Sequence, residues 1–408
     1  MTEQMNVPKL RFSEFDSMLG LSYFGELVND ITYGPRFSAE DYCSDGNVRT
    51  IRGTDMGANG EIKYHQVPTA QLDVKTVNRH ELKDGDLVMI TTADCGITSV
   101  YREQPIKHIC SAYAVKINLN ENADSTYFKY FYQTSKAQYE VSRFIRKATV
   151  SNLPGSDINR IRHYPPSLQE QQKIASFLSK VDEKIALLTE KKDKLTEYKK
   201  GVMQQLFNGK WQEQDGQLTF IPPTLRFKAD DGSEFPDWEE KKLGDLFSIS
   251  AGGDISKEHS NSVKTDKFKY PVFANAETNK GLHSYSDIYK ISQPCLTVSG
   301  RGSLGNAVFR DEPFYPIVRL LVLKAALPVD LKFYEYAINK LNIFNESTGV
   351  PQLTAPQLRT YAIVMPCIEE QKKIARAIES LDRKIDLVLL ELEKAKEWKK
   401  GLLQQMFV

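Results

Sequence analysis

The sequence lacks the patterns that mark the common classes of catalytic and metal-binding protein. Its 408 residues contain no GxxxxGK[ST] phosphate loop, and its six histidines form no HxxxH pair. The five cysteines are scattered without CxxC spacing, which is typical of reduced cytosolic thiols rather than of a disulfide framework or a zinc site. These absences predict a non-catalytic chain that binds no metal and no cofactor of its own.

The sequence also has no long apolar run and no strong charge of either sign. The run Leu320-Leu321-Val322-Leu323 ends at Lys324, well short of a membrane span, and the first residues lack the apolar segment of a signal peptide. The net charge of +1 does not by itself indicate a polyanionic partner. We therefore expect a cytoplasmic protein that does not bind membranes.

One stretch of sequence occurs twice, and the two copies are separated by a constant offset of 200 residues. The first copy begins Pro166-Ser167-Leu168-Gln169-Glu170-Gln171 and ends Gly201-Val202-Met203-Gln204-Gln205-Leu206-Phe207. The second begins Pro366-Cys367-Ile368-Glu369-Glu370-Gln371 and ends Gly401-Leu402-Leu403-Gln404-Gln405-Met406-Phe407. Because no gap is needed to align the copies, this repeat defines the organisation of the chain.

Each copy carries apolar residues at alternating spacings of four and three. The series are Ile174, Leu178, Val181, Ile185, Leu188 and Leu195, interrupted once by Lys192, and Ile374, Ile378, Leu381, Ile385, Val388 and Leu392. This heptad spacing predicts long helices that pack on another helix. One such stripe alone is most simply the core of a bundle. Two equal copies in one chain instead predict an antiparallel coiled coil in a pseudo-twofold molecule.

The repeated helices divide the chain into four segments: residues 1–165 (the first reader), 166–210, 211–365 (the second reader) and 366–408. The readers share short motifs, such as Leu10-Arg11-Phe12 and Leu225-Arg226-Phe227. In the first reader, residues 87–90 and 112–117 predict strands, and residues 127–145 predict one helix. We therefore expect an α+β fold with two mixed α/β domains separated by two long repeated helices.

Both readers carry a loop at the same place after a strand, with different residues in it. The second reader has Ser299-Gly300-Arg301-Gly302-Ser303-Leu304-Gly305, and the first has Ala93-Asp94-Cys95-Gly96-Ile97-Thr98. A simple backbone turn is one interpretation of the glycine cluster. The other is a close approach of the backbone to a phosphate or base edge, with Arg301 reaching outward. Loops that occupy the same position in both readers but contain different residues are what we expect of loops that determine sequence specificity.

The repeated motifs identify a family resemblance that covers residues 8–408. Each helix opens Pro-x-Leu/Ile-x-Glu-Gln-x-Lys-Ile, from Pro166 and Pro366, and closes Lys-Lys-Gly-x-x-Gln-Gln-x-Phe, from Lys199 and Lys399. Doubled around two divergent domains, these motifs resemble the specificity subunit of a bacterial type I restriction-modification enzyme. The resemblance implies that each reader is a target recognition domain for one half of a bipartite DNA site, with the helices fixing the spacer between the halves.

The same resemblance implies a set of partners. They are double-stranded DNA, two adenine-N6 methyltransferase (modification) subunits docked on the helices, and two ATP-dependent translocase-nuclease (restriction) subunits. S-adenosylmethionine, ATP and magnesium would then be bound by those partners and not by this chain. The chain itself would be a non-catalytic subunit of an assembled methyltransferase and endonuclease.

Arginines, lysines and small polar residues beside predicted turns are the candidates for contact with DNA, because they reach base edges and phosphates. In the first reader they are Arg36, Arg49, Arg52, Thr92, Asp94 and Thr98. In the second they are Lys257, Lys264, Lys267, Lys269, Asn275, Asn279, Arg301 and Asn306. For any one of these residues, a solvated surface charge or a salt bridge within the domain is the competing interpretation.

The charge of the readers leaves a second hypothesis open. Each reader is about two units negative, counted over residues 1–160 and 211–360, whereas a DNA-binding domain usually carries a basic excess. A coiled-coil scaffold with two protein-binding domains and no DNA contact is therefore the alternative. An enzyme fused to the helices is less favoured, because neither reader has a catalytic pattern.

Overall fold

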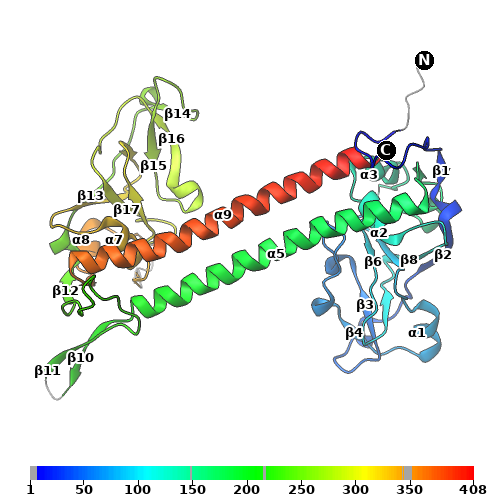
Figure 1. Cartoon of the computed structure of the whole chain (residues 1–408), viewed down its shortest axis with the longest axis horizontal. Coiled ribbons are helices and arrows are strands. Elements are labelled where there is room, and N and C mark those ends of the chain that lie inside the picture. Colours follow the sequence, from blue (N-terminus) through cyan, green and yellow to red (C-terminus); the bar gives the residue numbers. More distant parts are fainter. Residues whose placement is uncertain (1–6, 148, 215–216, 342, 344–351) are drawn as a thin grey trace. The chain divides into compact units, whose positions relative to one another are not determined.

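The chain folds as two compact units, and each contains one reader and part of both long helices. The computed structural model describes residues 7–408 except 148, 215–216, 342 and 344–351 (Figure 1). The first unit comprises Met1–Glu190 and Leu389–Val408, and the second comprises Lys191–Val388. No helix in these described residues is both long and apolar enough to cross a membrane.

The first reader is built on a four-stranded antiparallel sheet in the order β2-β8-β5-β6. These strands are β2 Val28–Tyr33, β8 Ala114–Leu119, β5 Leu87–Ile90 and β6 Thr98–Val100. A smaller sheet has the order β4-β3-β7, with β3 Val48–Ile51, β4 Thr69–Ala70 and β7 His108–Cys110, and a short pair joins β1 Ser22–Tyr23 to β9 Arg162–His163. The fully buried strand β5 at the centre explains why its sequence is continuously apolar.

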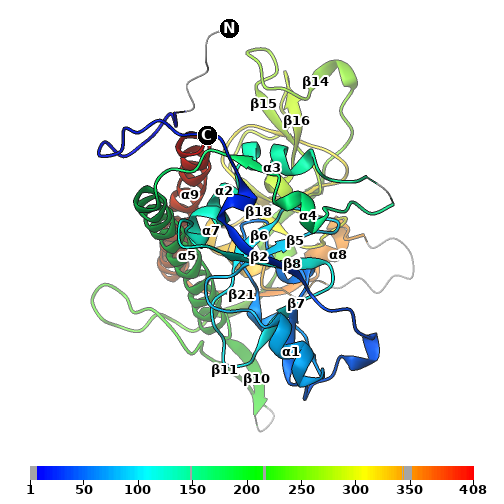
Figure 2. The ribbon, with the colours of Figure 1, turned by 90° about the vertical axis from the view of Figure 1, so that its right-hand side faces the viewer.

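The described part of the first reader also has four α-helices: α1 Val74–His80, α2 Ser125–Phe131, α3 Ser135–Ser142 and α4 Gly155–Ile158. Helix α2 packs beside β6 (Figure 2), and its Phe128 and Tyr130 enter the core. The predicted single helix over residues 127–145 is wrong, because the chain breaks between α2 and α3. The Thr134 side chain accepts a hydrogen bond from the backbone N–H of Ala137 and thereby caps a new helix.

The second reader repeats the order of the main sheet and the short strand pair, but its smaller sheet has one more strand, β14. Its main sheet has the order β13-β20-β17-β18 and its smaller sheet the order β14-β16-β15-β19, while β12 pairs with β21. The strands are β12 Glu239–Lys242, β13 Phe247–Ala251, β14 Ser260–Asn261, β15 Tyr270–Phe273, β16 Leu282–Ser286, β17 Cys295–Val298, β18 Ala307–Arg310, β19 Tyr315–Pro316, β20 Leu321–Ala325 and β21 Ala362–Met365. Its helices are α6 Leu243–Leu246, α7 Leu331–Ile338 and α8 Ala355–Arg359, and a hairpin of β10 Lys210–Gln214 and β11 Gln217–Ile221 precedes it.

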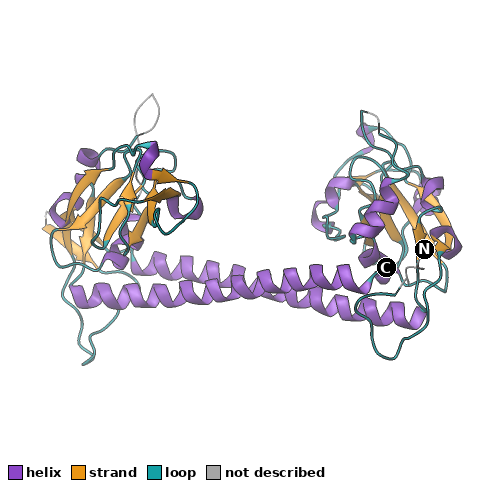
Figure 3. Ribbon diagram, turned by 90° about the horizontal axis from the view of Figure 1, so that it is seen from above, coloured by secondary structure: helices purple, strands orange, loops and turns teal. Residues whose placement is uncertain are grey.

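The two long helices are α5 Leu168–Leu206 and α9 Ile368–Met406, and in each unit the sheets lie on one side of the helix pair (Figure 3). In the first unit, the start of α5 packs on the end of α9, where Ile174, Leu178 and Val181 share a core with Leu402 and Met406. In the second unit, the end of α5 packs on the start of α9, where Leu206 meets Ile374 and Ile378. The helices are therefore antiparallel within each unit, and the predicted fold class is confirmed.

All twelve heptad residues are buried or half-buried. Ile174, Leu178, Val181, Leu188, Ile374, Ile378, Val388 and Leu392 are buried, and Ile185, Leu195, Leu381 and Ile385 are half-buried. Lys192, which interrupts the series, is half-buried and pairs with the adjacent Asp193. The stripe is narrow, as expected when each helix packs on one other helix and leaves its remaining faces exposed.

The repeated Glu-Gln pair fastens each reader to the start of its helix. Glu170 accepts two hydrogen bonds from the Arg11 guanidinium, each of 2.7 Å, and Glu370 accepts two from Arg226, of 2.9 and 3.2 Å. Glu370 also accepts a 3.0 Å hydrogen bond from Trp238 Nε1. These contacts explain the Leu-Arg-Phe motif of both readers, because its arginine is the partner of the helix glutamate.

The glutamines that follow these glutamates are buried and bind backbone. Gln171 Oε1 accepts from Asp124 N at 2.9 Å, and Gln371 Oε1 accepts from Asp330 N at 2.8 Å. Each side-chain amide donates to the carbonyl of the proline five residues earlier, Pro166 or Pro366. Asp124 and Asp330 are in turn the N-caps of α2 and α7. One glutamine thus joins the helix start to the reader helix in each unit.

The lysine of each closing motif completes a second contact. In the first unit, Asp182 accepts from Tyr130 OH at 2.8 Å and pairs with Lys399 at 2.7 Å. In the second unit, Tyr336 OH donates to Asp382 at 2.7 Å, and Lys199 pairs with the same carboxylate. The two networks are related by the 200-residue offset along the helices. Each ties a reader helix to both long helices.

Candidate nucleic-acid interface

The first reader has a cleft of about 1280 Å³ at one end of its main sheet. Its lining comes from the turns after β2 and β3, the loop after β5 and the turn before β8, together with Val150 and Asn152. Gly34 in the first turn passes so close to the carbonyls of Cys110 and Ser111 that a Cβ would lie about 2 Å from them. Only glycine fits there, so the turn that carries Arg36 is fixed against the strand behind it.

Four of the six candidates in the first reader meet in this cleft: Arg36, Arg52, Thr92 and Asp94. Arg36 is exposed, and no described residue pairs with its guanidinium. Arg52 is held by the buried Asp55 through hydrogen bonds of 3.0 and 2.9 Å, and these raise the pKa of the arginine. Its position is therefore fixed by the fold, while Arg36 is free to reach a ligand.

Arg49 and Thr98 lie away from the cleft. Arg49 turns inward and donates to the carbonyl of Tyr64 at 3.2 Å. Thr98 is 3% exposed, and its hydroxyl donates to the Gly96 carbonyl at 3.0 Å. Both side chains are thus engaged with the backbone of the reader and do not line the cleft.

The loops that follow the central strands of the two readers are built alike. Gly96 N donates to Ile90 O, and Gly305 N donates to Ser299 O, both at 2.9 Å. Leu153 N donates to Thr91 O at 2.7 Å, and Leu353 N donates to Gly300 O at 2.9 Å. This alignment makes Thr92 the counterpart of Arg301. The same backbone frame thus presents a hydroxyl in one reader and a guanidinium in the other.

The candidates in the second reader separate into two groups at opposite ends of β15. Lys257, Lys264, Lys267 and Lys269 are exposed and precede the strand, whereas Asn275 and Asn279 follow it. Asn275 is half-buried and joins neighbouring loops, because its Oδ1 accepts from Gly300 N at 2.8 Å. Arg301 donates to Gln352 Oε1 at 3.3 Å, and Asn306 pairs through its backbone with Ser299. The structure therefore brings Asn275 and Arg301 together but leaves the lysines elsewhere.

Two exposed residues with no distinctive sequence signal occupy equivalent places beside these loops. Gly34 N donates to Ala114 O, and Gly252 N donates to Leu320 O, which aligns Tyr113 with Arg319. Tyr113 lines the cleft of the first reader. Sequence patterns missed both residues, because each lies in a short turn before a buried strand and no motif marks that turn.

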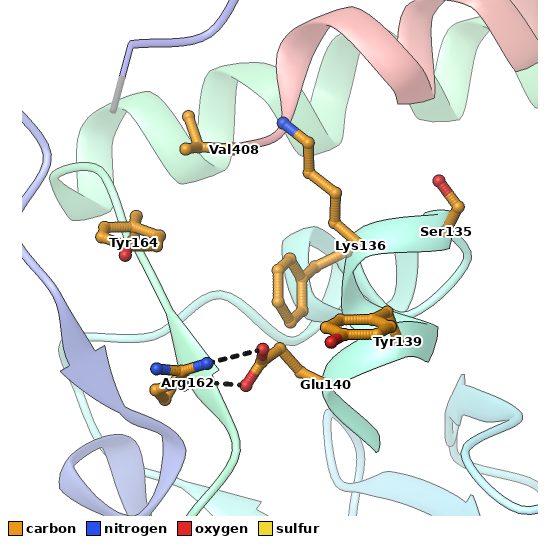
Figure 4. A pocket seen from close by; sticks show the side chains of 8 residues that line it. Ser135, Lys136, Tyr139, Glu140, Arg162, Tyr164 and Val408 are labelled. Carbon is orange, nitrogen blue, oxygen red and sulfur yellow. Dashed lines mark hydrogen bonds and ion pairs between the residues drawn. The ribbon is translucent and has the colours of Figure 1, made fainter. Parts of the chain in front are cut away.

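A second cavity of the first unit, of about 360 Å³, lies beside α3 and β9 and does not resemble a chemical site (Figure 4). Arg162 and Glu140 face each other there in a two-bonded ion pair, with both hydrogen bonds 3.0 Å long, and this pair lowers the pKa of Glu140. Lys136 donates to the Phe407 carbonyl at 3.4 Å. Its charged groups are thus used within the fold. Among the described residues, no cluster of His, Cys, Asp or Glu could hold a metal ion.

Comparison with known proteins gives the family. The family model for the type I restriction modification DNA specificity domain matches residues 25–197 and again residues 236–396. A type I specificity subunit of Mycoplasma pneumoniae is 28% identical over 35% of this chain and 44% of the relative, and a second from that organism is 26% identical over 53% and 54%. The matched part of the chain thus spans about half the length of these relatives. The EcoprrI specificity subunit of Escherichia coli is 20% identical over 86% of this chain and 84% of the relative.

Solved structures show the same fold. A type I restriction-modification S subunit from M. genitalium aligns with a TM-score of 0.61 at 16% identity, over 98% of this chain and 99% of that one. A chain from a study of complex assembly and conformational transition in the type I R-M system aligns with a TM-score of 0.56 at 14% identity, over 96% and 99%. With two matches to the family model that together cover most of its length, the chain belongs to the type I restriction modification DNA specificity family.

Proposed function

We propose that this chain is the DNA sequence-recognition and assembly subunit of a type I restriction-modification complex. The main support for the proposal is that the two readers have the same backbone arrangement but different residues at equivalent positions in their loops. The readers share the strand order of their main sheets and their loop hydrogen bonds, yet equivalent loop positions differ, as at Thr92 and Arg301. A common frame with different contact residues supports the reading of two different DNA half-sites by one chain.

The chain would contribute no chemistry of its own. Methyl transfer to adenine N6 would belong to two modification subunits, and translocation and cleavage to two restriction subunits. S-adenosylmethionine, ATP and magnesium would be bound by those partners. The slightly negative charge of each reader supports this division, because much of the phosphate contact would then come from the partner subunits.

The long helices would dock the modification subunits. Large apolar side chains stand exposed on them at positions related by the 200-residue offset, namely Leu187 with Leu387 and Tyr198 with Trp398. Leu389 and Leu390, close to Leu387 on the same helix, are also exposed, and exposed apolar residues that lie close together are typical of an interaction surface. The two copies of the pattern support two equivalent docking sites, one for each modification subunit.

The same helices would set the spacer between the half-sites. Each has 39 residues and is about 58 Å long at 1.5 Å per residue. Inserting one heptad after Glu190 and another after Leu390 keeps the apolar stripe in register and adds about 10 Å to both helices. We expect a longer spacer, by up to about three base pairs at 3.4 Å per pair, with both half-sites unchanged. An unchanged spacer would refute the role of the helices in spacing.

Methylome sequencing tests the whole proposal. This chain is expressed with its modification subunit in a host that lacks DNA methylation, and N6-methyladenine is mapped. A bipartite motif with methylation in each half is the expected result. A folded, assembled complex that methylates nothing would instead favour the scaffold with two protein-binding domains.

A further inference from the structure

Left-handed backbone at residues other than glycine is concentrated in the loops of the candidate interface. Five such residues occur in the described part of the chain. Ala93, at φ 65°, lies in the cleft of the first reader. The other four form two pairs in the second reader: Asn279 and Lys280 at φ 50° and 51°, and Val318 and Arg319 at φ 51° and 58°. Such backbone is unfavourable for a β-branched residue such as Val318, so the surrounding structure must impose it.

Asn275 holds the Val318–Arg319 turn in place. Its Nδ2 donates to Val318 O at 2.5 Å, while its Oδ1 accepts from Gly300 N, so one side chain joins this turn to the loop that carries Arg301. On the other side, Val318 N donates to Gly253 O at 3.0 Å. Asn275 is therefore occupied in supporting loops, and its predicted role as a direct DNA contact is replaced here by a positioning role.

Buried Arg310 fixes the second left-handed pair. Its guanidinium lies 3.6 Å from the centre of the Phe273 ring, and it donates to the carbonyl of Lys280. Phe273 ends β15, and the turn that begins there carries both Asn275 and Asn279. Arg310 thus anchors the turn that carries Asn275 from inside the domain, and Asn275 in turn holds the Val318–Arg319 turn.

These supported loops leave the Arg319 side chain exposed. It is exposed, and its guanidinium has no hydrogen-bond or ion-pair partner among the described residues, whereas Arg301 is engaged by Gln352. Its counterpart in the first reader is Tyr113, which lines the cleft. The constrained turn fixes the backbone from which Arg319 extends, and its unpaired guanidinium has both parallel N–H donors available for guanine O6 and N7.

We propose that Arg319 reads a guanine in the second half-site and that Asn275 positions it. This inference rests on the function proposed above and goes beyond it by naming the reading residue, the base and its support. The test is methylome sequencing of the complex with wild-type chain and with Arg319→Ala. We expect Arg319→Ala to lower discrimination at one guanine of the second half-site by roughly 5- to 150-fold, with the first half-site as internal control.

Three further variants separate reading from folding and from general DNA affinity. Arg319→Lys keeps the charge but cannot make two parallel bonds, so it should relax the same base position. Asn275→Ala should relax that position too, while methylation of the first half-site shows that the complex is assembled. Lys228→Ala removes an exposed charge of the second reader that is outside the loop cluster and is not a candidate DNA contact, so it should leave the recognised bases unchanged.

The outcomes distinguish the two proposals. If the wild-type complex methylates a bipartite motif and Arg319→Ala leaves the second half-site unchanged, the assignment of Arg319 is wrong and the proposed function stands. Relaxation at both half-sites would also overturn it, because a reading residue acts on one half only. If the wild-type complex methylates no bipartite motif, the proposed function itself fails.

Discussion

Removing the buried carboxylate of Glu370 should strongly destabilise the second unit. This carboxylate is completely buried and accepts hydrogen bonds from Arg226 and from Trp238 Nε1. Glu370→Ala would leave the buried indole N–H without an acceptor, and the Arg226 guanidinium, only 13% exposed, would keep only the Pro236 carbonyl and Asp237 at 3.9 Å. Removing one partner of a buried ion pair costs about 3–5 kcal/mol, so we expect a loss of about 4 kcal/mol. Glu370→Gln keeps an acceptor and should cost about half as much.

Hydrogen exchange can measure this loss for each unit separately. A destabilisation of about 4 kcal/mol should accelerate exchange of the core amides of β17 about 1000-fold and leave those of β5 unchanged. Glu170→Ala is the matched control, because Glu170 has the same arginine contact without the tryptophan. It should destabilise the first unit by about 1 kcal/mol less. A loss under about 1 kcal/mol at Glu370 would refute the reasoning.

Two further consequences concern groups buried in the readers. Burial among aromatic rings lowers the pKa of His163 from 6.5 to about 4, and neither ring nitrogen has a partner. On acidification the unfolded chain takes up the proton before the folded chain does. The free energy of unfolding should therefore fall by up to about 3 kcal/mol between pH 6.5 and pH 4. Urea titrations across that range measure this loss, and His163→Phe should abolish it. Tyr336→Phe removes the hydrogen bond to Asp382 and should destabilise the second unit alone by about 1.5 kcal/mol, with Tyr130→Phe doing the same in the first; equal effects of one variant on both units would contradict this.

The long helices could be predicted from sequence because their signal is periodic and local. Segments 166–210 and 366–408 contain helices that run from Leu168 to Leu206 and from Ile368 to Met406. The folds of the readers were harder to predict from sequence, because their sheets join strands that are far apart in the chain. The stretch after the first helix, a polar run with two glycines, gave no sign of the β10–β11 hairpin. There Trp211 and Phe220 pack together, and Phe220 contacts Trp238, which only the folded domain brings near.

Part of the candidate site could likewise be predicted from the sequence, and part could not. Equal placement of the loops at Thr92 and Arg301 was visible because both follow a strongly apolar strand. The turn at Val318 and Arg319 was not, because neither residue type favours left-handed backbone. That conformation is imposed by Asn275, which is more than 40 residues away in sequence. A residue placed by a distant hydrogen bond has no local signature.

Each long helix serves both units, and this predicts how the chain responds to truncation. The start of α5 packs in the first unit and its end in the second, so a chain cut after residue 210 keeps the first reader but loses Leu402, Met406 and Phe407 from its core. Ile174 and Leu178 would then face water at a cost of about 1.5–3 kcal/mol per side chain. We expect hydrogen exchange in α2 to accelerate in this fragment and to slow again when a peptide of residues 389–408 is added. Exchange as slow as in the full chain, without the peptide, would show that the first reader does not depend on α9.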